Sequence, residues 1–106
     1  MNRLEILLDH LSKDPAESFL YFAIAKEYEA VNQFNEAITY YRQLKQVNPD
    51  YVGLYYHLGH AYEEIDQIGE AFSEYDEGIA IAKRLSDLHS LAELQNARQN
   101  LEISNL

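Results

Sequence analysis

Residues 21–28 read YFAIAKEY, and residues 55–62 read YYHLGHAY. In both stretches an aromatic residue is followed at +3 by an aliphatic residue, at +4 by a small one and at +7 by a tyrosine. The two stretches start 34 positions apart, and the same interval separates Ala37 from Ala71 and Tyr41 from Tyr75. A fixed period of this length predicts helical units that bury their apolar faces against neighbouring units.

Apolar spacing and helix-breaking residues divide the chain into six expected helices and no strand. We expect them at residues 2–12, from Pro15 to about Val31, from Asn35 to Val47, from about Tyr51 to Ile65, from Glu70 to about Arg84, and from Ser86 or Asp87 onward. Asp14 is expected to cap the second helix, with Pro15 at its first position. Pro49 restricts the residue before it and so ends the third helix, after which Asn48 or Asp50 can cap the fourth.

Composition limits the classes of function. The 106 residues are of the size of one domain, and 47% of them are hydrophobic. A formal charge of −10 disfavours nucleic acid and anionic membrane surfaces, which both attract clustered lysine and arginine. The chain has no cysteine, which excludes disulfides and thiol nucleophiles. Residues 1–13 mix leucines with charged residues and offer no export or membrane-spanning segment, so we expect a cytoplasmic protein.

On the residues that recur, the chain resembles the tetratricopeptide repeat family. The resemblance covers repeats at 18–51 and 52–85, with 2–12 as a half-repeat helix and 86–104 as a capping helix, in a single domain of residues 1–106. It implies an all-α, right-handed α-solenoid of stacked antiparallel helix hairpins. Ala25 and Gly59 are then the small residues that let the two helices of a hairpin approach closely. Lys83 stands where the first repeat has Pro49, which permits the fifth helix to run on toward the sixth.

The same resemblance implies a non-enzymatic protein–protein interaction scaffold. In the family, first helices line a concave groove that receives a peptide or helix of a partner protein. The positions expected to face this groove, with His57 beside them, are Phe22, Lys26, Glu29, Tyr56, His57, His60 and Glu63. Phe22 and Tyr56 would anchor apolar groups of the ligand. The alternative is that these rings pack against the N-terminal helix or a second copy of the protein.

Two further functions compete with this one. The protein could be a self-associating adaptor that forms a homodimer through its groove or through the apolar stripe of its last helix. A metal-dependent enzyme using His57, His60 and Glu64 is a remote alternative, because their spacing supplies an incomplete ligand set. We therefore expect no catalytic residue, cofactor or metal. Seven acids and no base lie between Tyr62 and Gly78, either as a solvated face or as a docking surface for a basic partner.

Overall fold

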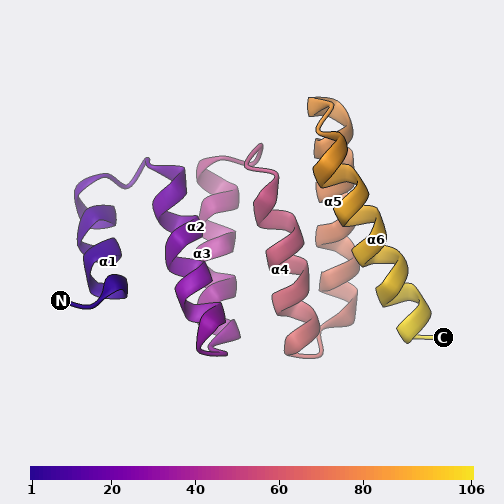
Figure 1. Ribbon diagram of the computed structural model, residues 1–106, viewed down its shortest axis with the longest axis horizontal. Helices are drawn as coiled ribbons and strands as arrows, with labels where there is room; N and C mark the ends of the chain where they lie inside the picture. Colours follow the sequence, from indigo (N-terminus) through magenta and orange to yellow (C-terminus); the bar gives the residue numbers. More distant parts are fainter. The chain divides into compact units, whose positions relative to one another are not determined.

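The computed structural model, which describes residues 1–106, contains six α-helices and no β-strand (Figure 1). The helices are α1 (Arg3–Lys13), α2 (Ser18–Ala30), α3 (Phe34–Val47), α4 (Gly53–Glu64), α5 (Ile68–Leu85) and α6 (Leu88–Ser104). The predicted all-α helical fold is therefore confirmed. The chain divides into two compact units, Met1–Tyr51 and Val52–Leu106, at the boundary that the 34-residue period places between the repeats. The grouping of all six helices into one domain stays a prediction.

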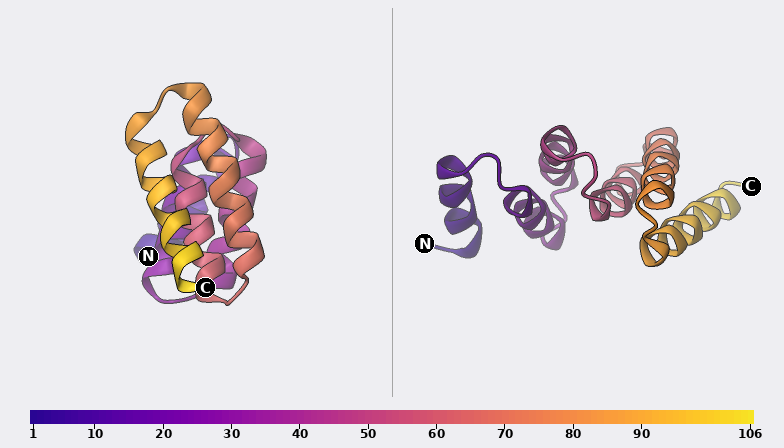
Figure 2. Two further views of the ribbon diagram at one scale, coloured as in Figure 1. Left: turned by 90° about the vertical axis from the view of Figure 1, so that its right-hand side faces the viewer. Right: turned by 90° about the horizontal axis from the view of Figure 1, so that it is seen from above.

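The first unit is built around the α2–α3 hairpin, with α1 packed on α2 (Figures 1 and 2). The side chains that the hairpin buries are Tyr21, Ala23, Ile24, Ala25, Ala37, Ile38, Tyr41 and Leu44. Both helices bury residues three or four apart, so each presents one apolar face to the other. The helix α1 is amphipathic but buries no residue completely.

The second unit repeats this hairpin with α4 and α5, and α6 packs on both helices (Figure 2). Its core consists of Leu54, Tyr55, Leu58, Ala61, Tyr62, Ala71, Tyr75, Ala82, Leu94 and Leu101. The close approach expected at Gly59 is present, because a methyl group added there would overlap the ring of Tyr75. A methyl group added at Gly78 on α5 would likewise overlap Cβ of Tyr55 on α4, so this glycine also allows the two helices to approach closely.

Both hairpin turns depend on a residue in the left-handed backbone conformation. Asn32 has φ 59° and Asp66 has φ 62°, and these positions are again 34 residues apart. Asparagine and aspartate tolerate this conformation better than most residues with a β-carbon. The Gln33 amide then donates to the Tyr28 carbonyl at 3.0 Å, and the second turn repeats this bond at 2.9 Å. The break expected between the helices ending near Val31 and beginning at Asn35 is therefore confirmed as a turn at residues 32–33.

The expected start of the second helix is wrong. It begins at Ser18 and not at Pro15, and the side chain of Glu17 caps it. Residues 15–16 instead form a turn, in which the Glu17 amide donates to the Asp14 carbonyl at 3.2 Å. The Tyr21 hydroxyl donates to the Pro15 carbonyl at 2.7 Å and holds this turn against α2.

The expected caps of the fourth helix are wrong as well. The helix α4 begins at Gly53 after Val52, and no side chain caps it. The Asn48 side-chain oxygen accepts the Asp50 amide at 3.2 Å and so closes a turn of its own.

The helix α5 confirms that the chain runs on past Lys83. It has 18 residues, against 14 in α3, and ends at Leu85, followed by Ser86 at φ 56°. No helix of the chain is both long enough and apolar enough to span a bilayer.

Candidate partner-binding faces

In the first unit, the predicted groove residues share one face of α2. Phe22, Lys26 and Glu29 are four and three residues apart, so their side chains project from the same side of the helix. The Lys26 side chain is 46% exposed and its ammonium lies 3.9 Å from the carboxylate of Glu29, which is only 15% exposed. Phe19 precedes Phe22 by one turn and is 54% exposed, which extends the face by one aromatic ring. Sequence analysis missed Phe19 because it lies outside the repeated pattern, although its spacing from Phe22 is a helical signal.

The ring of Phe22 is half-buried within its own unit. It meets the Tyr41 ring edge-on at 6.0 Å and the Tyr51 ring at 5.3 Å. Two tyrosines that follow it in the chain therefore cover part of Phe22. An apolar ligand would meet the remaining part of this ring together with the more exposed Phe19.

In the second unit, Tyr56, His60 and Glu63 occupy the corresponding face of α4. Tyr56 is half-buried and its ring stands nearly perpendicular to the His57 imidazole, with centroids 5.4 Å apart. His60 is exposed, and its Nε2 lies 3.5 Å from the Glu64 carboxylate. This face therefore presents an aromatic ring followed by an imidazole, as α2 presents an aromatic ring followed by an ammonium.

Glu29 and Glu63, the two acidic residues predicted to face the groove, also lie close to buried tyrosines of their own hairpins. Glu63 on α4 accepts a hydrogen bond from the hydroxyl of Tyr75 on α5. Burial raises the pKa of Tyr75, and the bond to Glu63 raises it further. Burial likewise raises the pKa of Tyr41, with Glu29 as the next cause. In the second repeat a phenol and a carboxylate thus form a hydrogen bond across the hairpin, which the sequence pattern alone did not predict.

The spacing of His57, His60 and Glu64 does not produce a metal site. No group of three or more histidine, aspartate or glutamate side chains in the chain could hold a metal ion. The His60 imidazole and the Glu64 carboxylate approach each other as an exposed i, i+4 pair. Such a pair is an ordinary feature of a helix surface.

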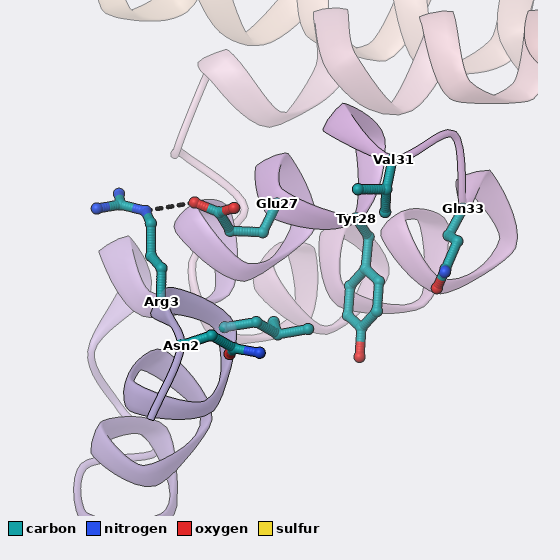
Figure 3. A pocket seen from close by; sticks show the side chains of 7 residues that line it. Asn2, Arg3, Glu27, Tyr28, Val31 and Gln33 are labelled. Carbon is teal, nitrogen blue, oxygen red and sulfur yellow. Dashed lines mark hydrogen bonds and ion pairs between the residues drawn. The ribbon is translucent and has the colours of Figure 1, made fainter.

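A separate pocket of about 310 Å³ opens in the first unit, between the start of α1 and the end of α2 (Figure 3). Its lining residues are Asn2, Arg3, Leu4, Glu27, Tyr28, Val31 and Gln33. Arg3 forms an ion pair with Glu27 at one side of this pocket. The Tyr28 ring, at the other side, stacks on Tyr40 with centroids 5.7 Å apart. The sequence did not predict this pocket, because it arises from incomplete packing of two helices.

Comparison with known proteins gives two family matches, TPR repeat over residues 25–66 and Tetratricopeptide repeat over residues 52–84. No curated protein matches the chain. Among solved structures, the chain is 35% identical to a tetratricopeptide repeat domain protein of Salinibacter ruber, with a TM-score of 0.76 over 81% of this chain and 97% of that one. It is 23% identical to a Bordetella parapertussis protein, with a TM-score of 0.86 over 99% and 91% of the two chains. It is 16% identical to MamA, with a TM-score of 0.71 over 96% and 66%. The last two are similarities of fold alone.

Proposed function

Because the chain belongs to the tetratricopeptide repeat family, we propose that it binds a peptide or helical segment of another protein on the first helices of its repeats. Proteins of this family are typically non-catalytic scaffolds for protein–protein interaction. The observation that carries the proposal is that α2 and α4 present the same order of chemistry at the same spacing, aromatic, then basic or titratable, then acidic. The middle residues of this order, Lys26 and His60, are exposed, whereas Glu63 also bonds to the buried Tyr75.

The chemistry of the α2 face indicates what the ligand contains. Phe19 and the uncovered part of Phe22 can bury an apolar side chain, and burial of aromatic surface is a common source of binding energy at interfaces. Lys26 is exposed on a protein with a net charge of −10. An acidic group next to the apolar side chain would therefore meet its favourable contact at Lys26 and be repelled by most other surfaces.

A charge reversal tests this assignment with a matched control. Lys26→Glu, combined with Phe19→Ser, changes the α2 face without removing a buried side chain. Lys83→Glu reverses an exposed lysine on α5 and serves as the control. The immobilised protein captures its partner from a lysate of the source cells, and the purified partner is then titrated against each variant. We expect the α2 variant to bind about tenfold or more weakly, as at interface hot spots, and the control to bind like wild type. Equal affinities of both variants would refute the assignment.

Self-association remains the competing function, and one observation favours it. Leu85 and Leu88 flank the α5–α6 turn and are 42% and 75% exposed, which places two apolar side chains on one corner of the second unit. Exposed apolar clusters of this kind mark interfaces more often than isolated exposed leucines do. Sedimentation at micromolar concentration distinguishes the two functions, because a strictly monomeric protein excludes a stable dimer through this corner.

A further inference from the structure

The two terminal helices are attached to their units in different ways. On α6, Leu94 and Leu101 are 1% and 3% exposed. Arg98 adds an ion pair with Asp76 and lies 5.2 Å from the centre of the Phe72 ring. No residue of α1 is buried to this extent. The apolar face of α1 consists of Leu4, Leu7, Leu8 and Leu11, all half-buried.

The ion pair between α1 and α2 adds little to the stability that their limited apolar contact provides. Arg3 and Glu27 pair with side chains that are 70% and 31% exposed, and exposed ion pairs contribute little to stability. The pocket beside them separates the first turn of α1 from the last turn of α2 (Figure 3). An isolated helix of 11 residues is unstable in water, so α1 depends on these contacts for its own structure.

The helix α2 contacts α3 more extensively than it contacts α1, so the main core of the first unit lies in the α2–α3 hairpin. Tyr21 and Ala25 of α2 are buried there, whereas Ile24 lies on the side of α2 that also carries Tyr28 and Val31. Such a difference in burial is typical of a segment that opens locally while its neighbours stay folded. Opening would uncover the side of α2 that carries Tyr28 and Val31, which is opposite to the side with Phe22 and Lys26.

The linker between α1 and α2 provides a pivot. Pro15 is held to α2 by the hydrogen bond from Tyr21. Asp14 before it has φ −141° and ψ 74°, which is outside the helical region and ends α1 before the proline. The chain can therefore turn at residues 13–14 without disturbing the start of α2.

We propose that α1 is an exchangeable helix, and that the second molecule to which it binds is another copy of this chain. The α2 surface already binds α1 within one chain, so α1 of a second copy would make the same contacts and only the pivot would differ. Two copies that exchange α1 form a closed dimer through the side of α2 that the proposed ligand does not use. The linker gives α1 an effective concentration of the order of 1 mM at its own α2, so exchange becomes substantial as the protein approaches that concentration.

Single cysteines in this cysteine-free chain provide the test. One sample of the full chain carries Arg3→Cys and another carries Glu27→Cys. The two samples are mixed at about 1 mM, which matches the effective concentration set by the linker, and are then treated with a short bismaleimide. A cross-link between positions 3 and 27 of different chains forms only when α1 of one copy lies on α2 of the other. The control mixture carries Asp76→Cys and Arg98→Cys, because this ion pair joins α5 to the firmly packed α6.

We expect the cross-link between positions 3 and 27 to exceed the control cross-link by about tenfold and to increase with protein concentration. Arg3→Cys and Glu27→Cys in the same chain, cross-linked at high dilution, should hold α1 in place and abolish the dimer. Amide exchange should be about 100-fold faster in α1 than in α2. If the cross-link between positions 3 and 27 stays at the control level, the proposal is overturned. This result would include the case in which α1 opens but binds a helix of some other protein. Equal amide protection of α1 and α2 also overturns it.

Discussion

Replacing Gly78 with alanine tests how closely α4 and α5 pack. A methyl group at this position would lie 2.6 Å from Cβ of Tyr55 and 3.1 Å from Cδ1 of Leu94. Carbon atoms in contact ordinarily lie about 3.5–4.0 Å apart, so the two helices would have to separate by about 1 Å. The Tyr55 atom is bonded directly to the backbone of α4 and its side chain is fully buried, so a change of rotamer cannot relieve the contact.

The expected loss follows from two opposing effects. Overpacking of a well-filled core costs about 1–3 kcal/mol, and the fixed position of the Tyr55 atom favours the upper part of this range. Alanine is a better helix former than glycine by about 1 kcal/mol. We therefore expect Gly78→Ala to lower the free energy of unfolding by about 1–2 kcal/mol, equivalent to a decrease in Tm of roughly 5–10 °C.

Gly69→Ala provides the matched control within the same helix. A methyl group added at Gly69 has no neighbour within 4 Å, so this variant should gain up to about 1 kcal/mol from helix propensity alone. Urea unfolding followed by circular dichroism measures both variants, with the midpoint as the readout and an unchanged m-value as the condition for comparison. The reasoning is refuted if the midpoint of Gly78→Ala equals or exceeds that of wild type.

Four further substitutions give five measurable outcomes. Gly59→Ala should also lower the urea midpoint, since its methyl group would overlap the ring of Tyr75; a rise would contradict the close approach of the helices. Tyr75→Phe removes the hydrogen bond to the Glu63 carboxylate and should lower the free energy of unfolding by about 1–2 kcal/mol, whereas no change would mean that the bond contributes nothing. Burial raises the pKa of Tyr75 in the folded state, so its contribution to the free energy of unfolding is complete below about pH 10 and is lost above it at about 1.4 kcal/mol per pH unit. Tyr75→Phe should therefore make the decline of stability at alkaline pH shallower. An unchanged slope would contradict the assignment. Asp66→Gly should raise stability by about 0.5 kcal/mol by relieving the left-handed backbone, and a loss of stability would contradict this assignment. Arg98→Met should accelerate amide exchange in α6 alone, and faster exchange throughout the second unit would show that the arginine stabilises more than this helix.

The sequence predicted the features that repeat. The 34-residue interval located both hairpins. Gly59 indicated the close approach of α4 and α5, because a small residue between aromatic positions leaves room for the neighbouring helix. The gap between the expected second and third helices likewise located the turn at Asn32. Each of these features belongs to a pattern that occurs twice along the chain, which is where pattern analysis is strongest.

The features that the sequence did not predict depend on individual hydrogen bonds made by tyrosine side chains. Asp14 and Pro15 form a standard helix-start pattern, yet the hydrogen bond from Tyr21 holds Pro15 in a turn and delays α2 to Ser18. Glu63 was expected to face a ligand, and its bond to Tyr75 became visible only once α4 and α5 were placed side by side. The number and identity of the groove residues stay a prediction, because a ligand has to be bound to identify them.

Site-specific photo-crosslinking tests the central claim, that the first helices of the repeats form the recognition surface. A photoreactive amino acid replaces Lys26 on α2, His60 on α4 or, as a control, Lys83 on α5, and the full chain is irradiated in a lysate of the source cells. The account predicts that the same protein is captured from positions 26 and 60 and is absent from position 83. Capture from position 83 alone, or equally from all three positions, would contradict it.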